Sequence, residues 1–126
     1  MTTFYDIDEA NARIPVMRDV LTLLRDQLAE LGRLRDESLS PDLDDAEARR
    51  IELRISGIVD QMHASVARID AWSITLRDIS TGLIDFPALV NGRQVCLCWR
   101  LGEDEVRWWH ELSAGFSGRL PLAELV

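Results

Sequence analysis

The sequence contains no lysine: all fourteen of its basic residues are arginines. This absence excludes Schiff-base and pyridoxal-phosphate chemistry, which need a lysine amine, and the lysine-containing phosphate loop of an NTPase. Acidic residues outnumber basic residues by 22 to 14, which gives a net charge of -8. Because surfaces that bind phosphates are basic, neither nucleic acid nor an anionic membrane is expected as a partner.

Long apolar runs are also missing. No segment approaches the roughly 20 apolar residues that a membrane-spanning helix needs. Residues 1–6 carry no basic stretch followed by an apolar core, as a signal peptide would. The 126 residues fit one domain, and we expect that domain to be cytoplasmic.

Residues 1–72 carry the pattern of two long helices. Apolar residues recur at alternating intervals of three and four over residues 14–31 and again over residues 48–72. This heptad spacing is typical of coiled-coil helices. Proline favours the first turn of a helix, so Pro15 suggests that residues 6–13 form a short separate turn.

The segment between the two helices contains helix-breaking and helix-starting signals. Ser40-Pro41 interrupts helical structure, and Asp44 with Glu47 three residues later resembles a capping box. The two helices are therefore predicted to form an antiparallel hairpin.

The hairpin is too long for a compact body of this size. A helix over residues 46–72 would extend about 40 Å, whereas the radius of gyration of such a domain is about 14 Å. Several apolar residues also lie partly outside the stripe formed by the heptad positions: Val16, Val20, Leu23, Leu34, Leu53, Val59 and Val66. We therefore expect a homodimer formed through the helical hairpin.

After residue 72 the apolar pattern changes to a period of two. Asn91-Gly92 predicts a type I′ hairpin that pairs Ala88 with Val95 and Phe86 with Leu97. Residues 72–77 also alternate and can supply a further strand. The face predicted to be buried consists of Ile84, Phe86, Ala88, Val95, Leu97, Trp99, Val106 and Trp108.

A second turn is predicted at Gly102-Glu103. A turn centred one residue later would place Arg100 opposite Arg107, and this like-charge pair disfavours it. The preferred register places His110 opposite Val95, on the apolar face. The predicted fold is α+β: a long antiparallel helical hairpin (1–72) followed by a β-meander of three or four strands and a C-terminal segment (73–126).

The C-terminal half also resembles a known family. The strings are Gly82-Leu-Ile-Asp-Phe-Pro-Ala88, Val95-Cys-Leu-Cys-Trp-Arg100, Gly102-Glu103, Trp109-His110-Glu111 and Gly115-Phe-Ser-Gly-Arg119. Together with the opening from Phe4 to Pro15, they are similar to the bacterial domain-of-unknown-function family numbered 2203. The resemblance implies a small bacterial cytoplasmic protein and supplies no activity.

The second face of the predicted sheet carries polar residues. Two arginine guanidinium groups beside a thiol and a carboxylate can bind a small anion, or they can lower the pKa of Cys98 enough to make this thiol reactive. The candidate ligand-binding residues are Asp85, Cys98, Arg100, Arg107 and Arg119. The alternative, which we favour, is a solvent-facing ladder of charge pairs, in which Arg119 bridges to Asp85 or Glu103.

A metal site is a further possibility for this face. Cys96 and Cys98 alone do not make one, because a structural zinc usually takes four cysteine or histidine ligands. A bulge at Trp108-Trp109 would turn His110 to the polar face. The candidate metal ligands are then Asp85, Glu103, His110 and Glu111.

These patterns do not bring a nucleophile, a base and an orienting group to one face, so an enzyme is not the expected class. The leading hypothesis is a homo-oligomeric interaction or scaffold protein that needs no cofactor. The second hypothesis is a module that binds a divalent metal ion or a small anion through the sheet.

Overall fold

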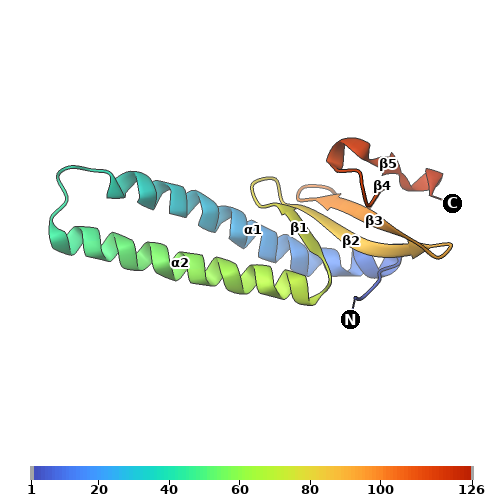
Figure 1. Ribbon diagram of the computed structural model, residues 1–126, viewed down its shortest axis with the longest axis horizontal. Coiled ribbons are helices and arrows are strands. Elements are labelled where there is room, and N and C mark those ends of the chain that lie inside the picture. Colours follow the sequence, from blue (N-terminus) through green and yellow to red (C-terminus); the bar gives the residue numbers. More distant parts are fainter. Residues whose placement is uncertain (1, 126) are drawn as a thin grey trace.

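The computed structural model describes residues 2–125. It consists of two helices followed by a sheet, which confirms the α+β prediction (Figure 1). The sheet has five antiparallel strands in the order β1-β2-β3-β4-β5 rather than three or four. Within the described residues no helix is both long enough and apolar enough to cross a bilayer. The elements are α1 (Ile7–Ser38), α2 (Asp45–Ala71), β1 (Thr75–Asp78), β2 (Leu83–Val90), β3 (Arg93–Arg100), β4 (Trp108–Glu111) and β5 (Leu120–Pro121), with short 3-10 helices η1 (Phe116–Gly118) and η2 (Leu122–Glu124).

Both long helices start at a capping box. Asp6 and Glu9 exchange hydrogen bonds at the start of α1, and Asp44 and Glu47 do so at the start of α2. The helix α1 continues through the exposed Pro15, so the prediction of a separate turn over residues 6–13 is wrong.

Contacts with the sheet hold the first turns of α1 in place. The Tyr5 backbone N–H donates to the Pro87 carbonyl at 2.8 Å, and the Val106 N–H donates to Asn11 Oδ1 at 2.7 Å. The Tyr5 ring also meets Phe86 edge-on at 5.1 Å between centroids. These tertiary contacts stabilise the helix N-terminal to Pro15, where sequence signals alone favour a break.

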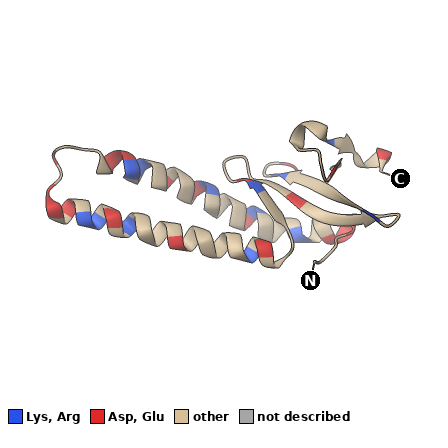
Figure 2. Cartoon of the chain, in the orientation of Figure 1, with Lys and Arg blue, Asp and Glu red and all other residues tan. Residues whose placement is uncertain are grey.

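The hairpin projects well beyond the sheet (Figure 1). Figure 2 shows acidic and basic residues of both signs along the two helices. Between the two helices, the heptad residue Leu28 is partly exposed and its neighbour Gln27 is buried instead. Gln27 Nε2 donates a hydrogen bond to Gln61 Oε1 at 3.1 Å. The buried residues of α2 all lie in the half nearer the sheet: Ile58, Met62, Ser65 and Ile69.

The first predicted strand pair is confirmed. Asn91 and Gly92 both have positive φ, and β2 pairs with β3 so that Ala88 opposes Val95 and Phe86 opposes Leu97. One face of the resulting sheet packs on α1 and belongs to the hydrophobic core. The residues predicted for that face are buried, apart from Trp108: Ile84, Phe86, Ala88, Val95, Leu97, Trp99 and Val106.

The predicted register of β4 is wrong by one residue. Cys96, not Val95, opposes His110, and Leu97 opposes Trp109. Because side chains alternate along a strand, this shift moves His110 to the second face and puts Trp109 rather than Trp108 in the core. The β4 pairing itself is regular, so no bulge at Trp108-Trp109 is involved.

The shift arises in the loop over residues 101–107. Instead of a two-residue turn, this loop makes hydrogen bonds to distant parts of the chain. The Leu101 N–H donates to the Gly82 carbonyl at 3.0 Å, and the Val106 N–H donates to Asn11 Oδ1 at 2.7 Å. Tertiary contacts therefore set the register that local turn propensity was expected to set.

We expect the two neighbouring tryptophans to differ in their effect on stability. Replacing Trp109 with Ala should lower the free energy of unfolding by about 3–5 kcal/mol, because it empties a core position. Replacing the half-buried Trp108 should cost less. Urea denaturation of both variants checks the register, and a larger loss for Trp108→Ala would contradict it.

Candidate functional site

Three buried polar side chains from three adjacent strands meet on the second face of the sheet. They are Asp85 of β2, Cys96 of β3 and His110 of β4, and each is at most 4% exposed. One ligand atom from each lies within 4.8 Å of those of the other two. The expected solvent-facing charge ladder is therefore not what this part of the face forms.

Asp85 is the centre of the cluster. Its Oδ1 lies 2.9 Å from His110 Nε2, and its Oδ2 accepts a hydrogen bond from Arg77 Nε at 2.7 Å. A buried carboxylate needs such partners, because an unpaired charge in the interior is strongly destabilising. Asp85 thus joins β2 to both β1 and β4.

The contact of the second ring nitrogen of His110 determines which nitrogen carries a hydrogen. Nδ1 lies 2.7 Å from the backbone carbonyl oxygen of Glu111. A carbonyl can only accept, so Nδ1 must carry a hydrogen. Nε2 then faces Asp85 Oδ1 either through a shared proton or through a metal ion that both atoms bind.

The two thiols are buried and free. Burial raises the pKa of Cys96; the Asp85 carboxylate adds to this rise, and Arg77 partly opposes it. Burial raises the pKa of Cys98 to about 12, although Arg119 acts in the opposite direction. The lowering of the Cys98 pKa by arginines, which the less favoured anion-site hypothesis allowed, does not occur, because desolvation outweighs the nearby positive charge.

Neither ring nitrogen of His110 is free to act as a general base toward a cysteine. A general base needs a free nitrogen within reach of the group that it deprotonates. Both nitrogens of His110 are already engaged, by Asp85 and by the Glu111 carbonyl. Cys98, with its high pKa, remains a thiol at neutral pH.

The C-terminal segment covers this side of the sheet. Residues 112–116 form one wall of a pocket of about 430 Å³, whose other lining includes Arg77, Asp85, Cys98 and His110. The covering segment is held by Arg119, whose guanidinium lies 4.6 Å from the Phe116 ring centroid. The site is thus a pocket beneath a covering segment.

The other predicted site residues lie outside the cluster. Arg119 pairs with Glu103 at 2.7 Å, which is one of the two bridges expected for it. Arg107 pairs with Glu105, and Arg100 lies 5.3 Å from the Phe116 ring centroid.

Glu111 forms an ion pair with Arg93 and therefore does not join Asp85 and His110. It opposes Val95 in the β4 register, whereas His110 opposes Cys96. Alternation then sends the two neighbouring side chains to opposite faces.

Sequence reasoning missed two residues of the site. Arg77 was assigned only to a further strand, and Cys96 was considered only in a pair with Cys98. Once β1 is paired with β2, Thr75 opposes Asp85, and alternation places Arg77 on the same face two residues further along, at the register shift between Leu76 and Asp78. Cys96 joins the site only because the β4 register places it opposite His110, and the turn signal at Gly102-Glu103 predicted a different register.

Comparison with protein families identifies the chain. Residues 3–122 match the family described as "Uncharacterized conserved protein (DUF2203)", and the chain belongs to this family. No curated protein matches it. No solved structure matches it either.

The high pKa of Cys98 predicts a dependence of stability on alkaline pH. The unfolded chain loses this thiol proton near the ordinary thiol pKa, whereas the folded chain keeps it up to about pH 12. In metal-free protein, the free energy of unfolding should therefore fall as pH rises through this window. Urea denaturation at several pH values should show a shallower fall for Cys98→Ala, and an unchanged slope would count against the assignment.

Proposed function

We propose that the protein binds a transition-metal ion of the zinc class through Asp85, Cys96 and His110. The observation that carries the proposal is the convergence of these three buried donors, one from each of three adjacent strands, within 4.8 Å. The hydrogen bond from His110 Nδ1 to the Glu111 carbonyl supports it, because metal-binding histidines commonly donate their other N–H in this way.

The donor set favours zinc over the alkaline-earth ions. A thiolate, an imidazole and a carboxylate are the ligand types that Zn²⁺ takes, whereas Mg²⁺ and Ca²⁺ prefer oxygen ligands throughout. Three protein ligands leave a fourth tetrahedral position open, as in zinc sites that exchange a bound molecule. This is the metal-binding alternative of the sequence hypothesis, with Cys96 in place of Glu103 and Glu111.

The cluster needs only small movements to hold such an ion. Around a tetrahedral zinc, oxygen and nitrogen ligands lie about 3.3 Å apart, and sulfur lies about 3.5 Å from either. Asp85 Oδ1 and His110 Nε2, now 2.9 Å apart, would separate slightly. Cys96 Sγ, within 4.8 Å of a carboxylate oxygen of Asp85 and a ring nitrogen of His110, would move inward by about 1.3 Å or less.

Binding also requires loss of the Cys96 proton. Because the pKa of this thiol is raised, metal affinity should increase with pH, as the ion replaces the proton. A reduced cysteine is needed throughout, so the proposal agrees with a reducing compartment such as the cytoplasm.

We expect chelator-treated full-length protein to bind one Zn²⁺ per chain. Cys96→Ser, His110→Ala and Asp85→Asn should each abolish stoichiometric binding, because each removes one of three ligands. Isothermal titration calorimetry with elemental analysis measures the affinity and the number of ions bound, and Zn²⁺ should raise the melting temperature of the wild type but not of these three variants.

Cys98→Ser is the matched control. Cys98 is a second buried thiol on the same strand and face, two residues from Cys96, but it is not part of the three-residue cluster. The Cys98 variant should therefore keep one Zn²⁺ per chain. Equal loss in the two serine variants, or no binding by the wild type, would contradict the metal site.

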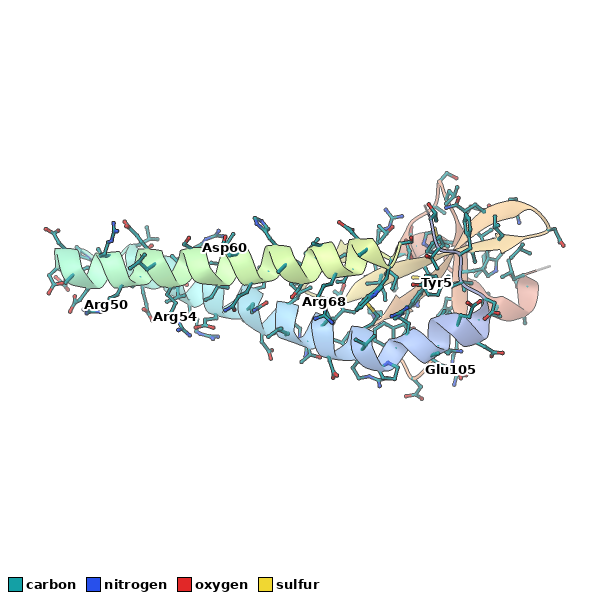
Figure 3. All side chains as sticks on the ribbon, turned by 90° about the horizontal axis from the view of Figure 1, so that it is seen from below. Tyr5, Arg50, Arg54, Asp60, Arg68 and Glu105 are labelled. Carbon is teal, nitrogen blue, oxygen red and sulfur yellow. The ribbon has the colours of Figure 1, made fainter. Side chains whose placement is uncertain are left out.

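Association through the hairpin is a second candidate function, favoured by the exposure of its outer half. Ile51 and Ile55 are only partly buried, and Leu23 and Leu53 are 49% and 60% exposed. The partner that fits is a second copy of the chain. Figure 3 shows Arg50, Arg54 and Asp60 on the stretch of α2 that extends away from the sheet. A second copy would thus meet charges of both signs rather than a surface of one sign.

Light scattering at micromolar concentration should give the mass of a dimer. Leu53→Asp should shift the mass toward the monomer, because it places a charge in the apolar contact. Leu39→Asp, at an 80% exposed position beyond α1, should leave the dimer intact. A monomer mass for the wild type would overturn this candidate and leave the metal site unaffected.

A further inference from the structure

The pocket beside the cluster offers an approach to a bound ion. Asp85 and His110 line the pocket of about 430 Å³, whereas Cys96 is not among its lining residues. An ion held by these three residues therefore has its protein ligands on the sheet side. The coordination position that these ligands leave open would then face the pocket.

The charges around that position favour a single negative charge in the ligand. Two negative ligands, the Asp85 carboxylate and the Cys96 thiolate, balance a divalent ion, and the neutral His110 adds no charge. Arg77 then leaves one positive charge at the pocket. Its ion pair with Asp85 uses Nε, so its two terminal nitrogens take no part in that contact, and its guanidinium also lies within reach of Cys96.

Apolar side chains complete the pocket. Leu83, Leu112 and Phe116 line it together with the hydroxyl-bearing Ser113. Leu112 and Phe116 are 54% and 42% exposed, so a ligand in the pocket would cover apolar surface that is now in contact with water. The volume is within the range of small-molecule sites.

We propose that this pocket binds a small monocarboxylate with an apolar substituent. One carboxylate oxygen occupies the open position of the metal ion, and the other accepts hydrogen bonds from the terminal nitrogens of Arg77. The substituent lies against Leu83 and Phe116. This inference rests on the proposed metal site, because the ion supplies one of the two anchors.

The test uses full-length protein loaded with Co²⁺, whose visible spectrum reports a change in coordination. Butanoate should alter the spectrum saturably and bind about tenfold more tightly than acetate, because it buries two more methylene groups. Butanamide, which has the same chain but no negative charge, should leave the spectrum unchanged.

Two variants test the charged contact and the apolar contact of the ligand separately. Arg77→Gln should weaken butanoate binding by about tenfold or more, with the Co²⁺ content measured in the same sample. Phe116→Ala should bring the affinities of butanoate and acetate closer together. Arg107→Gln is the matched control, since Arg107 is an exposed arginine that pairs with Glu105 and does not line this pocket.

The outcomes distinguish the two proposals. If the protein takes up no Co²⁺, the metal site fails and the carboxylate pocket fails with it. If Co²⁺ binds at Asp85, Cys96 and His110 but carboxylates leave its spectrum unchanged, only the pocket proposal is overturned. An equal response to butanamide, or equal weakening by Arg77→Gln and Arg107→Gln, overturns it as well.

Discussion

The contact between Asp85 and His110 is the constraint on which the second face of the sheet depends. It spans from β2 to β4 across the intervening β3, and both side chains are almost fully buried. A carboxylate in this position needs its partners, because removing one partner of a buried charged pair is strongly destabilising. Arg77 from β1 and the Glu111 carbonyl complete the set, so polar groups of three strands, β1, β2 and β4, are joined at one point.

The two faces of the sheet have different roles. The apolar face packs on α1 and joins the core that continues into the hairpin, which orders the strands. The second face is buried by the C-terminal segment, and there the strands present polar groups instead of apolar ones. Stability therefore comes mainly from one face, which leaves the other free to hold a carboxylate, a thiol and an imidazole in a fixed arrangement.

Most of the fold could be predicted from the sequence because it is specified locally. Heptad spacing, the Asp44–Glu47 capping box and Asn91-Gly92 each act over a few residues, and the helical hairpin and the β2–β3 register follow from them, although the start of α1 before Pro15 does not. The β3–β4 register could not be predicted, because residues 101–107 are positioned by distant groups such as Asn11 and Gly82. Since one residue of register reverses a strand's faces, this one loop decided whether His110 reached Asp85.

Zinc K-edge X-ray absorption of the Zn²⁺-loaded protein in solution tests the central claim most directly. Binding by Asp85, Cys96 and His110 predicts one sulfur at about 2.3 Å and nitrogen or oxygen ligands at about 2.0–2.2 Å, in four-coordinate geometry. The Cys98→Ser variant should give the same spectrum. A shell without sulfur, or one with two sulfurs, would contradict the account.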